Sequence, residues 1–169
     1  MTETVYLLLG SNMGDREKYL HEALSRLEKL EGLEIVAVSP IYVSEAKEMK
    51  GENPSFLNQV VKGEYLYSAL ELLSGLEQIE VQLDRTGKGR KQARTIDCDI
   101  LLFGNQHIAT PKLTVPHPKL LARPFALVPL LEIDPLAVHP VTHRPLSEHL
   151  TEKDRSTILL FKDHVARNI

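Results

Sequence analysis

The sequence predicts an α+β fold, in which two helices pack on one face of a mainly antiparallel sheet. Apolar runs of strand length alternate with two amphipathic helical stretches, in the order strand, helix, strand, strand, helix, strand. Eight of the ten prolines lie within residues 111–145, a segment that therefore cannot supply interior strands. The composition, 43% hydrophobic and 25% charged, is that of a globular domain with a sizeable core.

The first strand is predicted over residues 5–9, an apolar run that is closed by a glycine. The helix after it begins at Asp15, whose carboxylate can cap the first turn, and ends at Gly32. Its apolar stripe consists of Leu20, Ala23, Leu24, Leu27 and Leu30. A second strand follows over residues 33–38.

Residues 41–54 are polar, and we expect a long irregular loop there. The third strand is predicted over residues 56–65, where apolar and polar residues alternate. Ser68 and Glu71 form the capping box of the second helix. The residues predicted to face inward from this helix are Ala69, Leu70, Leu73, Leu76, Ile79 and Leu83.

The fourth strand of the core runs from Arg94 to Gly104 and contains two aspartates, Asp97 and Asp99. Alternation along a strand places both carboxylates on one face, about 7 Å apart. The residues predicted to face the core are Ile96, Cys98, Ile100 and Leu102. Paired carboxylates need a cation or donors, and Mg²⁺ requires only one or two of them. The pair predicts a magnesium site, with a solvated face of an edge strand as the alternative.

A basic segment, residues 85–94, leads into this strand and contains five cationic residues and no acidic one. Taken alone, such a run is more often a solvated surface. Beside a pair of carboxylates it favours a nucleoside polyphosphate, held between metal ions and cations. The chain contains neither a G-x-G-x-x-G nor a G-x-x-x-x-G-K-[ST] motif, so a Rossmann site and a P-loop are both unsupported.

The proline-rich segment is predicted to wrap the surface after a turn at residues 104–106 and a short return strand near residue 108. Within it, residues 123–131 form the expected helix, and residues 157–161 a last strand. The whole order is a ferredoxin-like βαββαβ core with a proline-rich C-terminal wrap, and we expect residues 1–169 to form a single domain.

Charge and cysteine content limit the partners and the compartment. A net charge of −3 disfavours a nucleic-acid binder, and the single cysteine excludes an internal disulfide. The chain has no signal-like N-terminus and no apolar run long enough for a membrane span. We therefore expect a cytoplasmic protein without nucleic-acid or membrane partners, as a monomer or a weak oligomer.

Four motifs, read together, resemble the 6-hydroxymethyl-7,8-dihydropterin pyrophosphokinase family of folate biosynthesis. The motifs are Gly10-Ser11-Asn12, Phe56-Leu57-Asn58, the strand from Arg94 to Gly104, and Leu113-Thr114-Val115-Pro116-His117-Pro118 with Arg123-Pro124-Phe125. The resemblance covers residues 5 to about 135. It implies transfer of the pyrophosphoryl group of ATP to the pterin hydroxymethyl group, giving AMP and the pterin diphosphate.

The resemblance also implies the site residues. Asp97 and Asp99 would hold two Mg²⁺ ions and, with Arg85 and Arg94, form the catalytic set. The ATP-binding residues would be Glu77, Arg85, Arg94, Ile100, Lys112, Thr114, His117 and Arg123. The pterin-binding residues would be Ser44, Phe56, Asn58, Asp97 and Phe125. Glu80 matches a family glutamate near the nucleotide, while Glu77 and Glu80 could otherwise belong to a solvated helix face.

One departure and two alternatives remain. The chain has Lys91-Gln92-Ala93 where the family often has Trp-Gly-Pro, and it contains no tryptophan. The loops 41–54 and 84–93 are expected to close after ATP binds. The alternative functions are a two-metal phosphohydrolase that uses the aspartate pair and a non-catalytic ferredoxin-like module that binds a ligand.

Overall fold

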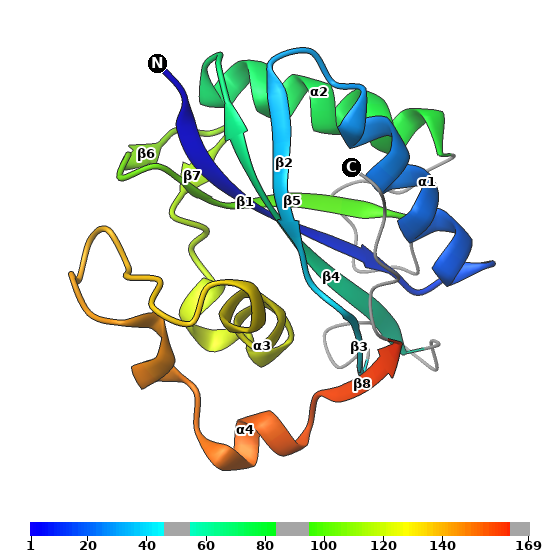
Figure 1. Cartoon of the computed structure of the whole chain (residues 1–169), viewed down its shortest axis with the longest axis vertical. Helices are drawn as coiled ribbons and strands as arrows, with labels where there is room; N and C mark the ends of the chain where they lie inside the picture. The colour runs from blue at the N-terminus through cyan, green and yellow to red at the C-terminus, as the bar shows by residue number, and fades with distance from the viewer. Residues whose placement is uncertain (46–54, 84–94, 163–169) are drawn as a thin grey trace.

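The computed structural model describes residues 1–45, 55–83 and 95–162. Its main sheet is antiparallel and has the strand order β5-β1-β4-β3-β8, with β2 also paired to β4 (Figure 1). The strands are β1 (Glu3–Ser11), β2 (Leu33–Val38), β3 (Ile41–Ser44), β4 (Phe56–Tyr65), β5 (Asp97–Phe103) and β8 (Leu159–Lys162). A separate small hairpin joins β6 (Ile108–Ala109) to β7 (Thr114–Val115).

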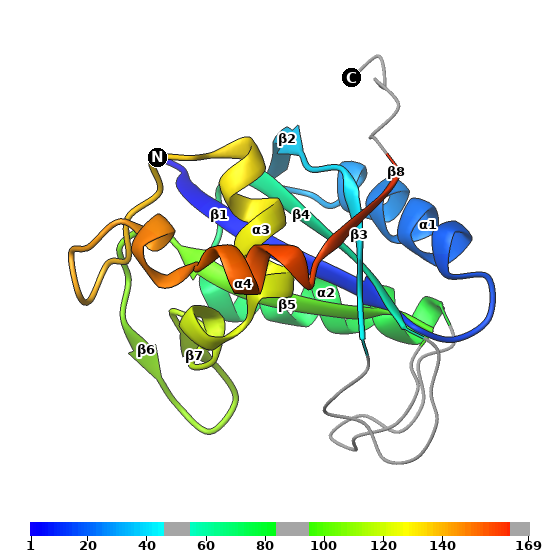
Figure 2. The same cartoon turned by 90° about the horizontal axis from the view of Figure 1, so that it is seen from below.

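Helices cover both faces of the sheet. They are α1 (Arg16–Glu28), α2 (Ala69–Gln82), α3 (Pro124–Ile133) and α4 (Glu152–Ser156), with 3₁₀ turns at Leu120–Ala122 and Leu146–His149. The helices α1 and α2 lie on one face, and α3 lies on the other (Figures 1 and 2). The predicted α+β class and the ferredoxin-like order of strands and helices are confirmed.

The first two helices begin where their sequences predict. Asp15 accepts a hydrogen bond from the Lys18 amide at 3.2 Å, and Ser68 and Glu71 form the reciprocal capping box. The chain leaves α1 through Gly32, whose φ of +87° lies in the region that strains other residues. Local sequence therefore determines both helix starts and this turn.

The buried face of α2 differs from the predicted one. Its buried residues are Ala69, Leu72, Leu76, Ile79 and Glu80. Leu70, predicted to face inward, is 51% exposed, and Leu72 takes its place. Because three leucines stand within four positions of this helix, its own periodicity does not select among them. Packing against the sheet makes the selection.

Residues 41–44, which we predicted to be part of a loop, form the strand β3. The ten-residue strand β4 pairs with β2 along one half and with β3 along the other, where Tyr42 lies opposite Asn58. Between the two short strands, the buried Ser39 hydroxyl accepts a hydrogen bond from the Val60 amide at 2.9 Å. A long neighbouring strand thus orders a segment whose sequence alone looks irregular.

The proline-rich segment does more than wrap the surface, because α3 builds a second core. This core lies on the sheet face opposite α1 and α2 and combines strand residues with residues from the C-terminal third. Its fully buried members are Val60, Leu120, Ala126, Leu127, Leu130 and Leu146. Pro129 lies inside α3, and Pro124 occupies its first turn, where no amide donor is required. Prolines exclude this segment from the sheet, as predicted, but not from the core.

A bulge in β5 changes the alternation that its sequence predicts. Tyr6 of β1 lies opposite Leu102, and Leu7 lies opposite Ile100, so Leu101 is an extra residue on β5. Cys98 and Ile100 face the first core as predicted, whereas Leu102 faces the second core together with Leu101. The prediction for Leu102 was wrong because strict alternation ends at the bulge.

Among the described residues, no helix has both the length and the apolar character needed to cross a membrane.

Candidate active site

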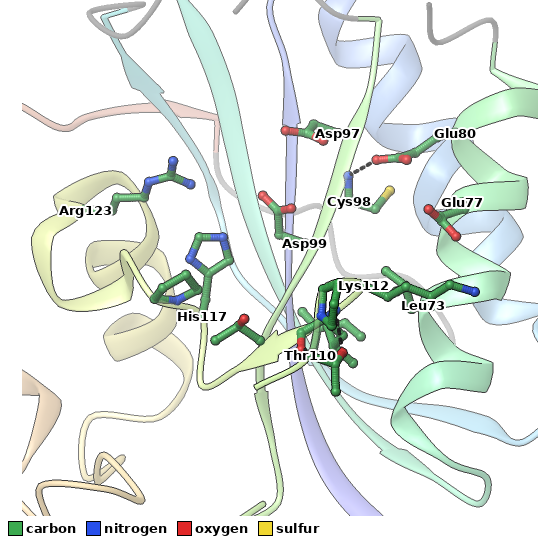
Figure 3. Close-up of a pocket in the computed structure, with 15 residues that line it drawn as sticks. Leu73, Glu77, Glu80, Asp97, Cys98, Asp99, Thr110, Lys112, His117 and Arg123 are labelled. Atoms are coloured by element: carbon green, nitrogen blue, oxygen red, sulfur yellow. Dashed lines mark hydrogen bonds between the residues drawn. The ribbon is translucent and has the colours of Figure 1, made fainter. Parts of the chain in front are cut away.

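The Asp97 and Asp99 side chains lie on one face of β5, as their spacing predicts. Both residues are partly buried, while Cys98 between them is buried in the first core. β5 is an edge strand of the described sheet. Its position therefore agrees both with the predicted metal site and with the alternative, the polar face of an edge strand. Figure 3 shows both carboxylates directed into a hollow beside the strand.

The hollow is a cavity of about 440 Å³ between α2, β5, the β6–β7 hairpin and the segment that leads into α3. Both aspartates line it. Every residue that was predicted to bind ATP and that the structure describes lines it as well, namely Glu77, Ile100, Lys112, Thr114, His117 and Arg123. Arg85 and Arg94, and most of the loops expected to close, lie outside the described residues.

The His117 ring is held in a defined orientation at the cavity wall. The backbone N–H of Lys119 donates to His117 Nδ1 at 3.1 Å, and the His117 backbone N–H donates to the Leu101 carbonyl at 2.9 Å. Because Nδ1 accepts a hydrogen bond, the neutral ring carries its proton on Nε2. The Val115–Pro116 peptide bond before it is cis.

Arg123 connects the two predicted binding regions. It lines the cavity, and its guanidinium lies 5.3 Å from the centre of the Phe125 ring, as a cation–π pair requires. Phe125 lies in the first turn of α3, on the same sheet face as the aspartates. No ring contact joins Phe56 to Phe125 among the described residues, so their pairing around a pterin stays a prediction.

The other predicted pterin residues cluster at the adjoining strands. Asn58 Nδ2 donates to Ser44 Oγ at 2.8 Å and to the Tyr42 carbonyl at 3.4 Å. In the registered strands, Gly10 of β1 lies between Asn58 of β4 and Asp97 of β5. Tyr42 of β3 continues this row beyond Asn58, and the pair of Ser44 and Phe56 lies two residues further along the same two strands. The predicted pterin residues other than Phe125 thus lie on β3, β4 and β5, and Gly10 of β1 lies between β4 and β5.

Gly10 lies among the predicted pterin residues, although the sequence reasoning gave it no role. A Cβ atom built there would lie 3.5 Å from the Phe56 ring and 3.7 Å from Asn58 Oδ1. Only a residue without a side chain leaves that space open beside Phe56 and Asn58, the two predicted pterin residues. A glycine directly after an apolar run, immediately before two polar residues, is the sequence signal that could have indicated this position.

We expect Gly10→Ala to weaken pterin binding by about tenfold or more, because the added methyl group fills the space beside Phe56 and Asn58. Its backbone φ is not positive, so alanine fits the strand, and stability should change by no more than about 1 kcal/mol. Calorimetric titration with hydroxymethyldihydropterin measures the effect. Binding of an ATP analogue to the same variant is the control and should be unchanged. Unaltered pterin affinity would contradict this placement.

Glu77 and Glu80, for which the sequence left two interpretations, occupy different environments. Both residues line the cavity, and Glu77 is partly buried. Glu80 is only 5% exposed, and its carboxylate accepts a hydrogen bond from the Cys98 backbone N–H at 2.8 Å (Figure 3). Neither residue belongs to a solvated helix face.

The donor set of the cavity fits magnesium. Two carboxylates on one strand face supply the one or two protein ligands that Mg²⁺ takes when phosphate oxygens and water complete its shell. In residues 1–45, 55–83 and 95–162, no group of three or more His, Cys, Asp or Glu side chains is arranged to hold a metal ion. The richer ligand set of a two-metal phosphohydrolase is therefore not found in these ranges.

Comparison with protein families gives one match that spans most of the chain. The sequence model of the 7,8-dihydro-6-hydroxymethylpterin-pyrophosphokinase (HPPK) family matches residues 6–135. This range contains the residues that line the cavity, the predicted pterin residues and the whole of α3.

Curated relatives agree with the family match. The chain is 42% identical over 149 residues to the 2-amino-4-hydroxy-6-hydroxymethyldihydropteridine pyrophosphokinase of Aquifex aeolicus, covering 88% of this chain and 91% of that protein. It is 41% identical to the enzyme of the same name from Bacillus subtilis, covering 79% of each. It is also 41% identical to the folic acid synthesis protein fol1 of Schizosaccharomyces pombe, but spans only 21% of that longer protein.

A crystal structure of Plasmodium falciparum HPPK-DHPS has the same fold, with a TM-score of 0.70 at 16% identity. The match covers 88% of this chain and 45% of the Plasmodium chain. Together, the family match over residues 6–135 and the bacterial relatives of similar length identify the chain as a member of the HPPK family, whose enzymes transfer the pyrophosphoryl group of ATP to 6-hydroxymethyl-7,8-dihydropterin in folate biosynthesis.

Proposed function

We propose that this pyrophosphokinase holds the triphosphate of ATP in the cavity beside β5 and places the pterin over Gly10. One observation carries the proposal. Six residues from α2, β5, the β6–β7 hairpin and the approach to α3 were predicted to bind ATP, and all of them line one cavity with the paired aspartates. Residues that far apart in sequence share a cavity with a carboxylate pair most simply because they bind one ligand.

Asp97 and Asp99 are proposed to hold two Mg²⁺ ions, which neutralise phosphate charge when bound. Around them, the chain supplies donors. His117, Lys112 and Arg123 line the same cavity and are proposed to supply hydrogen-bond donors and positive charge to the phosphate oxygens. Arg85 and Arg94 are proposed to grip further phosphate oxygens with their forked guanidinium groups.

The pterin is proposed to lie across the neighbouring strands. Because Asn58 Nδ2 is engaged by Ser44 and Tyr42, its Oδ1 is left to accept a hydrogen bond from the N–H edge of the pterin ring. Phe56 and Phe125 supply apolar ring surface on either side. This placement brings the pterin next to Asp97, which lies beside Gly10 on β5.

The reaction then needs positioning more than covalent help from the protein. The pterin hydroxymethyl oxygen attacks the β-phosphorus of ATP and forms the new P–O bond. The bond between the β-phosphorus and the oxygen shared with the α-phosphate breaks, and its electron pair leaves with AMP. The hydroxyl proton is released to solvent. Fixed cationic and N–H donors stabilise the charge that develops on the phosphate oxygens.

Product analysis tests the proposal. We expect the purified chain, with Mg²⁺, ATP and hydroxymethyldihydropterin, to form AMP and the pterin diphosphate in equal amounts. A reaction without pterin is the control and should yield no AMP. Formation of ADP or free phosphate instead would favour a kinase or phosphohydrolase and would contradict the proposed transfer. Chromatography of nucleotides and pterins measures both products.

A further inference from the structure

Glu80 is a charged residue in a position where an apolar one would pack more easily. It belongs to the buried stripe of α2, together with Leu72, Leu76 and Ile79, and only 5% of its surface is exposed. Burial of a carboxylate is unfavourable unless hydrogen bonds compensate for the lost water. Its contact with the Cys98 amide, at 2.8 Å, therefore requires a functional explanation as well as a structural one.

The contact falls on the strand that carries the two aspartates, at the residue between them. β5 pairs with β1 on one side only, where Leu9 lies opposite Cys98, and it has no strand partner on its other side in the described sheet. An edge strand normally turns such N–H groups toward water. Here a helix side chain reaches the edge and takes the place of a neighbouring strand (Figure 3).

Cys98 is thus held from three directions. Pairing with β1 fixes one edge, the buried thiol packs into the first core, and the Glu80 carboxylate binds the amide at the other edge. Asp97 and Asp99 are attached directly to this residue and point to the opposite face, into the cavity. A shift of the Cys98 backbone would move both carboxylates together, and sites of this kind tolerate displacements of only about 0.5 Å.

We propose that Glu80 is a positioning residue that fixes the spacing of the two aspartates through the Cys98 amide. Glu80 lines the same cavity as the two aspartates, and the proposed effect on the metal site passes through the backbone of β5. This inference rests on the proposed function of the aspartate pair. It assigns Glu80 a role in the metal affinity of the site.

Two substitutions distinguish the hydrogen bond of Glu80 to the Cys98 amide from the negative charge of its carboxylate. Glu80→Gln keeps an oxygen acceptor at the same distance but removes the charge. Glu80→Asp keeps the charge but is one methylene too short to reach the amide. Glu71→Ala is the control, because it removes the capping box of the same helix far from Cys98. All three are compared with the wild-type chain.

Two measurements read the effect without turnover. Amide hydrogen exchange at Cys98 in the ligand-free protein reports the hydrogen bond. Binding of Mn²⁺ in the presence of α,β-methylene-ATP, followed by electron paramagnetic resonance, reports the metal site. For Glu80→Asp we expect exchange about tenfold faster and metal affinity about tenfold to a hundredfold weaker. For Glu80→Gln and Glu71→Ala we expect both quantities to stay within about threefold of the wild type.

Several outcomes would overturn the inference. One is a Glu80→Asp protein that loses Cys98 protection but binds Mn²⁺ normally, which would make the contact purely structural. Another is a Glu80→Gln protein that protects Cys98 but binds Mn²⁺ tenfold more weakly, which would make the charge itself the active feature. If Glu80→Asp does not fold, the Glu80→Gln result alone decides. A wild-type chain that shows no metal binding with the analogue would instead refute the proposed function.

Discussion

Asp97→Ala is expected to reduce turnover by about a thousandfold or more while leaving the fold intact. The Asp97 carboxylate is proposed to hold a metal ion, and it lies beside Gly10 at the predicted pterin position, so its loss affects both substrates. The residue is only partly buried on an edge strand, and its side chain belongs to neither core. Truncation should therefore shift the midpoint of thermal unfolding by no more than about 4 °C.

Steady-state assays of AMP formation and thermal unfolding measure the two quantities in parallel. Asp154→Ala is the matched control, since Asp154 caps the short helix α4, whose residues do not line the cavity. It should retain turnover within about twofold. An Asp97→Ala enzyme with more than a tenth of the wild-type rate would remove Asp97 from the proposed metal site. Loss of folding in the same variant would show that Asp97 has a structural role.

Leu127→Ala is expected to lower the free energy of unfolding by about 3 kcal/mol, a large fraction of the stability of a typical domain. Leu127 is fully buried in the second core, between α3 and the sheet. Truncation leaves a cavity that the surrounding strands cannot close. Because α3 also presents Phe125 and follows Arg123, we expect pterin and ATP affinity to fall together with stability.

Leu136→Ala is the matched control for this prediction. The same chemical change occurs in the same proline-rich segment, but Leu136 is 83% exposed, so stability should change by less than about 0.5 kcal/mol. Urea denaturation at equilibrium measures both variants. Equal stability of the two would mean that the C-terminal third only wraps the surface, as its proline content first suggested.

The features that the sequence predicted correctly depend on contacts between residues close in the chain. The capping box of Ser68 with Glu71 spans four residues, and the common face of Asp97 and Asp99 spans three. Alternation and capping follow from backbone geometry over such distances, whatever the remainder of the chain does. These local rules were sufficient to locate the carboxylate pair.

The features that were missed depend on partners far away in sequence. Pairing with β4 makes residues 41–44 a strand, and packing on the sheet buries Leu72 in place of Leu70. Likewise, Gly10 gains its place in the site only when β4 and β5 flank it. Neither the composition nor the periodicity of the sequence predicts the strand-pairing register that brings such residues together.

The shared cavity was predictable only through the resemblance to a family. Lys112 and His117 lie in a proline-rich stretch without helical or strand period, and nothing in their own spacing directs them toward Asp99. Their positions follow from the β6–β7 hairpin and from the second core, which carry the chain back across β5. Tertiary structure, rather than a local motif, assembles this part of the site.

The extra residue in β5 has a consequence for the polarity of the whole strand. Counted back from Phe103, which faces the first core, uninterrupted alternation would turn Asp97 and Asp99 into that apolar core as well. Leu101 interrupts the alternation, so residues before and after it that are an even number of positions apart point to opposite faces of the sheet. Because of this one inserted leucine, the C-terminal end of β5 contributes apolar side chains to both cores, while its N-terminal end directs Asp97 and Asp99 into the cavity. What matters for this arrangement is that one residue is inserted, more than which residue it is. The number of residues in β5 is therefore constrained as tightly as their side chains are.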